Sequence, residues 1–242
     1  MTRAPLTPNA WLRYDLIGQF LEKLSGRRSF LEIGCGQGAL ATYLVDRFEY
    51  VGFEPDKDSF RVARARVGTR GMVHNAFLPE VPYRSFDLVG AFEVLEHIED
   101  DERALELWIR WLNPGGWLLL SVPAGPGRLG ACDRMVGHYR RYTRDQMACV
   151  LQRAGFAEVR VRSCGFPLGY ALEAARNRIA RTRQVGSYED RTAASGRLLQ
   201  PGSGLSAVTR LFTAPFRFAQ RPFQETELGT GIVAFARRPI SR

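Results

Sequence analysis

Phe30-Leu31-Glu32-Ile33-Gly34-Cys35-Gly36-Gln37-Gly38-Ala39-Leu40 is the stretch that decides the fold of this 242-residue chain. Its first residues are apolar with one acid among them, which indicates a short buried parallel strand. The three alternating glycines indicate a tight loop, and Ala39 to Leu44 is expected to open a helix. Because glycine has no Cβ atom, a ligand can lie directly on such a loop. Strand, loop and helix in this order predict an α/β fold that binds a ligand at the carboxyl end of the strand.

The loop is compatible with two kinds of cofactor. Gly34-x-Gly36-x-x-Ala39 satisfies the relaxed dinucleotide fingerprint, so NAD is one candidate. Glu32 favours a different one, because a carboxylate before the loop suits a cofactor with an ammonium group, whereas a helix N-terminus suits pyrophosphate. The run from Glu32 to Gly38, E-I-G-C-G-Q-G, resembles the first motif of class I S-adenosylmethionine-dependent methyltransferases. The resemblance implies S-adenosylmethionine as the cofactor.

Two later stretches are similar to the same family. They are F-D-L-V-G-A-F-E-V-L-E-H-I from Phe86 to Ile98, and L-N-P-G-G-W-L-L-L from Leu112 to Leu120. The resemblance covers Ser29 to Val161, and the later V-P-A and G-H-Y-R-R-Y-T runs resemble a bacterial methyltransferase-domain subgroup of unassigned substrate. The resemblance to the class I family implies a Rossmann-like sheet of seven strands, mostly parallel with an antiparallel last strand. Helices are expected on both faces, with a helical insertion before the last strand.

The cofactor residues are predicted at the ends of successive strands. Glu54 ends the second predicted strand, twenty positions after Gly34, where a carboxylate can accept hydrogen bonds from a ribose diol. By resemblance, Asn75 and the residues after it lie where the family contacts adenine, although an aspartate is more usual there. The predicted cofactor-binding residues are Glu32, Gly34, Cys35, Gly36, Glu54, Pro55, Asn75, Ala76 and Phe92.

The predicted catalytic groups lie farther along the chain. Glu93, Glu96 and His97 have the i, i+3, i+4 spacing of one helical face. Glu-x-x-Glu-His is similar to the metal-binding run of ubiquinone-pathway O-methyltransferases, and together with His138 it resembles metal-dependent ribose methyltransferases of small RNAs. One interpretation is therefore a magnesium or manganese site on Glu93, Glu96, His97 and His138. In the metal-free alternative, His97 or His138 is the general base and Glu93 faces the cofactor.

We expect one domain over residues 1–242, divided into four parts. They are an N-terminal arm and helix (1–28), a cofactor-binding core (29–165), a substrate-side insertion (166–224), and the last strand with a tail (225–242). Asn9 is the expected cap of a helix from Ala10. The insertion contains nine arginines and three acids, and Ser187 to Gly204 is rich in turn residues. It is interpreted as a lid, with membrane contact, plain packing or a dimer contact as alternatives.

Composition narrows the class of partner. The net charge is +9, but the basic residues are scattered and only two are lysines, so nucleic-acid binding is not favoured. The four cysteines form no Cys-x-x-Cys pair. The sequence has no apolar signal core and no run of about 20 apolar residues, so a cytoplasmic protein is expected. Peripheral contact of residues 166–224 with the inner membrane face is a further expectation.

The arginines after His138 have two interpretations. Arg140 and Arg141 either bind an anionic substrate or pair with Asp133 or Asp145.

The predicted activity is methyl transfer, with oxygen of a small-molecule, glycan-linked or lipid-linked acceptor as the expected target. An RNA ribose methyltransferase and a non-catalytic cofactor-binding module are the alternatives. The sequence does not identify the acceptor or the oligomeric state.

Overall fold

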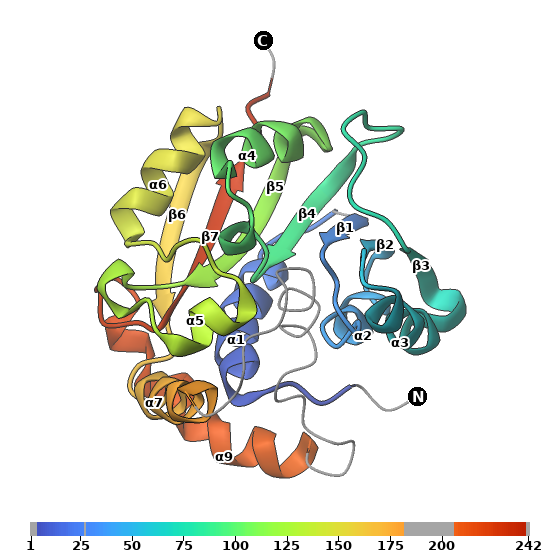
Figure 1. Ribbon diagram of the computed structural model, residues 1–242. Coiled ribbons are helices and arrows are strands. Elements are labelled where there is room, and N and C mark those ends of the chain that lie inside the picture. Colours follow the sequence, from blue (N-terminus) through green and yellow to red (C-terminus); the bar gives the residue numbers. More distant parts are fainter. Residues whose placement is uncertain (1–3, 27, 182–205, 241–242) are drawn as a thin grey trace.

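Seven strands form one sheet in the order β3-β2-β1-β4-β5-β7-β6 (Figure 1). The computed structural model describes residues 4–26, 28–181 and 206–240. The strands are β1 (Ser29–Ile33), β2 (Glu49–Phe53), β3 (Gly71–His74), β4 (Phe86–Phe92), β5 (Leu112–Pro123), β6 (Ala157–Cys164) and β7 (Gly231–Arg237). β1 to β5 pair in parallel, whereas β7 is antiparallel to both β5 and β6. The predicted sheet, mostly parallel with an antiparallel last strand, is confirmed.

Helices cover both faces of the sheet. They are α1 (Pro8–Glu22), α2 (Ala41–Leu44), α3 (Lys57–Val67), α4 (Asp101–Arg110), α5 (Ala131–Val136), α6 (Arg144–Arg153), α7 (Leu168–Arg181) and α9 (Ser206–Ala219). Short 3-10 helices are η1 (Gly68–Arg70), η2 (Leu95–His97), η3 (Pro126–Arg128) and η5 (Arg221–Phe223). Neighbouring β5 residues illustrate the two faces: Leu118 joins a core with α4 and α6, while Leu119 joins a core with α1 and α2. This alternation follows from the two-residue period of a strand.

The order of the strands fixes where a ligand fits. β1 pairs with β2 on one side and with β4 on the other, so the chain crosses over at β1. Ile33, Phe53 and Ala91 lie side by side in this register, and the chain leaves all three strands at the same edge. Such a switch point leaves a crevice outside the carboxyl ends of the strands.

Two helices begin at other residues than the sequence predicts. α1 begins at Pro8, and its cap is Thr7, whose side-chain oxygen accepts a hydrogen bond from the Ala10 N–H at 3.2 Å. Asn9 is therefore a helical residue and not the cap, because proline is favoured in the first turn, where no N–H is needed. The helix after the glycine loop begins at Ala41 and has only four residues, so it starts later than predicted.

The arginine-rich insertion is helical where it is described. α7 and α9 belong to it, whereas Ser187 to Gly204 lies outside the described residues. α9 exposes Leu211, Phe212 and Phe218 to solvent, and membrane contact through this segment stays a prediction. Within the described ranges, no helix is both long and apolar enough to cross a bilayer.

α9 packs beside α1 (Figure 1), and polar side chains anchor it there. The Arg217 guanidinium donates to the Asp15 carboxylate through Nε at 2.8 Å and also through Nη2. The Gln220 side chain donates to the Leu12 carbonyl at 3.1 Å and accepts from the Gly165 N–H at 3.1 Å. Asp15 and Gln220 are both buried. Residues more than 200 positions apart are thereby joined.

Asp15→Ala is expected to lower the free energy of unfolding by about 1–2 kcal/mol, because charge-assisted hydrogen bonds are lost while the half-buried Arg217 regains some water. Urea unfolding measures the change. Glu106→Ala is the matched control: its partner Arg103 is 3.8 Å away and both side chains are more than half exposed, so a change below about 0.5 kcal/mol is expected. Equal effects of the two substitutions would contradict the anchoring role of Asp15.

Candidate functional site

The glycine loop after β1 has the shape that the sequence predicts. Gly34 and Gly36 have φ angles of 65° and 54°, in the left-handed region that disfavours side chains. A Cβ atom on Gly34 would lie 2.7 Å from Cγ2 of Val94. A Cβ atom on Gly36 would meet no atom of the described chain within 4 Å. Gly34 is therefore needed for packing, whereas the open side of Gly36 lets a ligand approach the backbone.

Glu54 holds this loop in place. Its carboxylate oxygens accept hydrogen bonds from the N–H groups of Gly36 and Asp56, each at 2.8 Å. Burial raises the pKa of Glu54, while these two hydrogen bonds oppose the rise. A carboxylate offers about four acceptor sites, so lone pairs remain for the hydroxyls of a ribose. Glu54 thus shapes the loop and presents an acceptor at the crevice.

Glu32 is buried in β1 beside this loop. It accepts a hydrogen bond from the Tyr50 hydroxyl at 2.5 Å. Burial raises the pKa of Glu32 to about 8, with a further rise from the nearby Glu54. At neutral pH the side chain therefore holds a proton in the absence of a cation beside it.

The other predicted cofactor residues line the same edge of the sheet. Asn75 is exposed after β3, and its side-chain nitrogen donates to the carbonyls of Glu54 and Pro55 at 2.9 and 3.0 Å. This leaves the side-chain oxygen of Asn75 as the acceptor for a ligand. The remaining members are the buried Cys35, the exposed Ala76 and the half-buried Phe92. The predicted set is therefore brought together at the carboxyl ends of β1 to β4, and its roles stay predictions.

The predicted helical face of Glu93, Glu96 and His97 is wrong. β4 ends at Phe92, Glu93 has a left-handed φ of 59°, and only Leu95–His97 forms a short 3-10 turn. Glu93 is instead held in place by Arg13 of α1, at 2.6 Å, and by the Ser121 hydroxyl, at 3.2 Å. Burial opposes ionisation of Glu93, but the charges of Arg13 and His138 keep its pKa below the usual value.

Glu96 has a very different environment from Glu93. Its side chain is fully buried, and neither carboxylate oxygen accepts a hydrogen bond from another residue in the described part of the chain. Burial and the charge of Glu93 raise the pKa of Glu96 well above its usual value. One oxygen lies 3.8 Å from Nε2 of His138.

His138 is oriented by an aspartate. Its Nδ1 lies 2.8 Å from the carboxylate of Asp133, whose pKa is lowered by His138 and Arg141 despite partial burial. An ionised Asp133 requires the proton of the neutral imidazole on Nδ1, which leaves a lone pair on Nε2. His97 lies beside it with ring centroids 4.7 Å apart, and burial together with His138 lowers the pKa of His97 to about 4.

Three of the four predicted metal ligands are brought together. Glu96, His97 and His138 each offer one metal-ligand atom, and these three atoms lie within 4.8 Å of one another. The unpartnered oxygens of Glu96 and the Asp133–His138 pair fit a metal site, because metal-binding histidines usually bond a carboxylate through their second nitrogen. Glu93 is not part of this cluster, because Arg13 holds its carboxylate.

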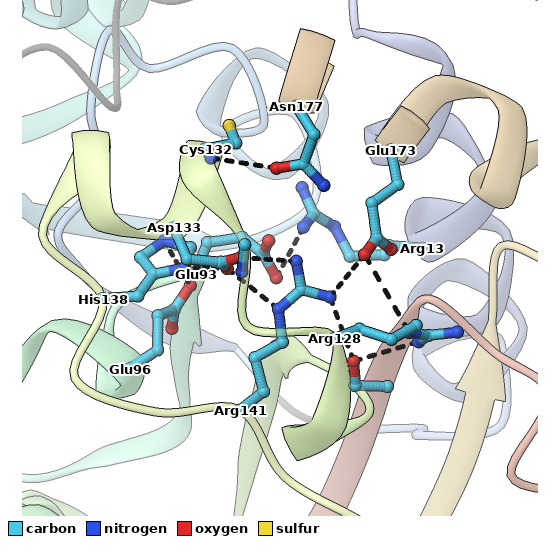
Figure 2. A network of polar contacts seen from close by, with 12 residues as sticks. Arg13, Glu93, Glu96, Arg128, Cys132, Asp133, His138, Arg141, Glu173 and Asn177 are labelled. Carbon is cyan, nitrogen blue, oxygen red and sulfur yellow. Dashed lines mark hydrogen bonds and ion pairs between the residues drawn. The ribbon is translucent and has the colours of Figure 1, made fainter. Parts of the chain in front are cut away.

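Arg141 connects this cluster to α7 (Figure 2). Its Nε and Nη2 donate to both oxygens of Asp133 at 2.9 and 2.7 Å, and Nη1 donates to Glu173 of α7 at 2.8 Å. Arg141 thus pairs with Asp133, one of the two predicted acids. Arg140 pairs instead with Asp101, at 2.9 Å, which the sequence analysis did not anticipate.

A polar cavity of about 60 Å³ opens beside Glu93 and His138. Its walls come from α1, α5 and α7 and from the carboxyl-end edge of the sheet. Three lining residues were missed by sequence analysis: Arg13, Glu173 and Arg176. They lie on helices outside the recognised motifs, and their spacing carries no local signal that distinguishes them from surface charges.

Comparison with known sequences identifies the family. The sequence model of the methyltransferase domain matches residues 9–161. A probable S-adenosylmethionine-dependent methyltransferase of Mycolicibacterium smegmatis is 31% identical over 156 residues, covering 61% of this chain and 60% of the relative. A ubiquinone biosynthesis O-methyltransferase of Leptothrix cholodnii is 31% identical over 120 residues, covering 46% of this chain. The matched region spans only 50% of that relative.

Solved structures share the fold at low sequence identity. A methyltransferase of Thermotoga maritima, described as a possible histamine N-methyltransferase, has a TM-score of 0.60 at 18% identity, covering 96% of this chain and 91% of that one. Phosphoethanolamine N-methyltransferase 2 of Haemonchus contortus, with S-adenosylmethionine bound, has a TM-score of 0.59 at 18% identity. It covers 96% of this chain and 54% of that one.

These matches decide against the dinucleotide-binding interpretation of the glycine loop. The family match includes the loop, Glu54 and the run from Glu93 to His97, and it extends to the end of the recognised motifs. The chain belongs to the methyltransferase domain family, is similar to a probable S-adenosylmethionine-dependent methyltransferase, and shares the fold of solved methyltransferases.

Proposed function

We propose that this enzyme methylates a hydroxyl oxygen of a small-molecule, glycan-linked or lipid-linked acceptor, with His138 as the general base. The observation that carries the proposal is the pair of Asp133 and His138 at the wall of the cavity. Asp133 fixes the tautomer, so Nε2 is available to accept a proton. Similarity to ubiquinone biosynthesis O-methyltransferases supports oxygen as the target.

The residues at the switch point fit the cofactor. Gly36 leaves open space over the backbone, and Glu54 has lone pairs for a ribose diol. The position of Glu32 in β1, beside the loop, supports a role for its carboxylate toward the ammonium group of the cofactor. When bound, S-adenosylmethionine supplies a methyl group on a positively charged sulfur.

The chain's own residues would orient the acceptor and manage its proton. A cofactor held at the switch point would supply the methyl group to the acceptor oxygen and keep the electron pair of the broken carbon–sulfur bond, and Nε2 of His138 would accept the hydroxyl proton. Asp133 and Arg141 keep the imidazole in position, which matters because displacement requires alignment of the reacting atoms. Glu93 lies between the cofactor crevice and the cavity and is anchored by Arg13.

A divalent metal on Glu96, His97 and His138 is the second candidate. The unpartnered oxygens of the buried Glu96 favour it. Two imidazoles and one carboxylate suit manganese or zinc better than magnesium, which prefers oxygen ligands. The metal would make an acceptor hydroxyl easier to deprotonate. In that case Nε2 of His138 binds the metal and another group accepts the proton.

Glu54→Ala is expected to weaken S-adenosylmethionine binding by about ten- to a hundredfold, because a charged acceptor of hydroxyl hydrogen bonds is lost. Calorimetric titration with S-adenosylmethionine, S-adenosylhomocysteine and NAD measures the effect. Glu49→Ala is the control, since Glu49 is an exposed residue of the same strand. Unchanged cofactor affinity in Glu54→Ala would contradict the ribose role.

Binding of S-adenosylmethionine is expected to release a proton from Glu32. Below its pKa of about 8 the buried carboxyl is protonated. A bound ammonium favours the ionised form, so affinity should rise with pH between about pH 6 and 7.5, where the cofactor's amino group is still charged. Titration in buffers of different ionisation enthalpy counts the released protons. Glu32→Gln should remove this release; the same release in both proteins would show that Glu32 does not face the ammonium.

His138→Ala is expected to lower kcat by about 10²- to 10⁴-fold, the usual contribution of a general base, while cofactor affinity is retained. Transfer of a labelled methyl group to a panel of hydroxylated acceptors measures it. With His138 as the base, a chelator and Glu96→Gln should leave the rate nearly unchanged.

The metal candidate predicts the opposite pattern. Glu96→Gln and the chelator would both abolish transfer, and manganese would restore the wild-type enzyme only. Arg134→Ala, an exposed substitution on α5, is the control for indirect effects. Full activity of His138→Ala would contradict both candidates.

A further inference from the structure

Arg176 of α7 is the one cavity arginine that the described chain leaves without a hydrogen bond or ion pair. Its Nε is buried and has no hydrogen-bond partner. Its charge acts on groups inside the site: burial raises the pKa of Cys132 and Arg176 opposes that rise, and Arg176 also contributes to the lowered pKa of Glu93. A buried donor without an acceptor costs free energy. A ligand that supplies an acceptor to Arg176 would remove this cost.

The neighbouring arginines are already matched. Arg13 pairs with Glu93 at 2.6 Å. Arg141 binds Asp133 through two nitrogens and Glu173 through the third.

Arg128 donates to the carbonyls of Ala124 and Gly229 at 3.0 and 2.6 Å, and its Nε lies 3.9 Å from Glu173 (Figure 2). None of these contacts involves Arg176. Within the part of the chain that the structure describes, its guanidinium therefore remains available for a ligand.

The carboxylates around the cavity are paired with other arginines. Four guanidinium groups, of Arg13, Arg128, Arg141 and Arg176, surround the cavity and its network. Glu93 pairs with Arg13, and Asp133 and Glu173 pair with Arg141. Among the described residues, Arg176 has no carboxylate of its own, and an anionic group of the ligand would supply one.

We propose that Arg176 binds an oxyanion, a carboxylate or a phosphate, on the methyl acceptor. The proposal rests on the proposed function, because it gives the acceptor of that reaction an acidic group. A guanidinium is suited to this task, since its planar fork matches two oxygens of a carboxylate or phosphate.

Arg176 and His138 line the same cavity. An acceptor that enters this cavity can therefore present its anionic group to Arg176 and its hydroxyl to His138 at the same time.

Arg176→Gln tests the proposal, with Arg178→Gln as the matched control, because Arg178 is exposed on the same helix. Inorganic phosphate and acetate are titrated separately into each protein, with and without saturating S-adenosylhomocysteine, and binding is followed by NMR. The wild type and Arg178→Gln should bind at least one anion, and Arg176→Gln should bind it about tenfold more weakly or not at all, as expected for one charged hydrogen-bond partner. Preference for phosphate or acetate identifies the kind of acceptor. Circular dichroism and thermal unfolding confirm that the variants are folded.

Two results would overturn the proposal: neither anion binds the wild type, or Arg176→Gln binds both as well as Arg178→Gln does. Failure of the proposed function is seen separately. S-adenosylhomocysteine binding reports on the cofactor site in all three proteins, and the titrations without it report on Arg176 alone. Once an acidic acceptor is found, Arg176→Gln should raise KM and leave kcat nearly unchanged, whereas His138→Ala should lower kcat.

Discussion

The buried guanidinium of Arg141 joins the parts of the proposed acceptor site. It binds both oxygens of Asp133 and one oxygen of Glu173, and it also donates to the Ala124 carbonyl at 3.3 Å. The end of β5, α5 and α7 are thereby fixed relative to one another. Removing one member of a buried ion network leaves an uncompensated charge, so the geometry is strongly maintained. Through Asp133 the same guanidinium determines the orientation of His138.

The two halves of the enzyme are built on different physical principles. On the cofactor side, backbone geometry dominates: left-handed glycines form the loop, and Glu54 secures it through two backbone N–H groups. On the acceptor side, charged side chains from separate helices surround a small cavity. Glu93 lies at the junction, because it directly follows β4 and pairs with Arg13 of α1. This division is consistent with a fixed cofactor site and an acceptor site that depends on the surrounding helices.

Errors in the sequence analysis arose where tertiary contacts override local spacing. Glu93 and Glu96 suit one helical face by spacing alone, but β4 continues to Phe92 and Glu93 then adopts a left-handed φ. Consequently the two carboxylates have unlike surroundings: Arg13 lowers the pKa of Glu93, whereas burial and the charge of Glu93 raise the pKa of Glu96. In contrast, the cap of α6 is local: the Thr143 side chain accepts a hydrogen bond from the Gln146 N–H, so this helix start depends only on residues within one turn.

The sequence by itself determined the sheet, the glycine loop, and the acidic and amide groups at the strand ends. These features depend on local backbone preferences and on the rule that parallel strands present their carboxyl ends at one edge. Only the tertiary structure decided which charges meet in the acceptor cavity. Arg13 comes from α1 and Arg176 from α7, and each is brought to the catalytic loop by packing of helices distant in sequence. Side-chain pairing over such separations depends on the whole fold, and no local pattern encodes it.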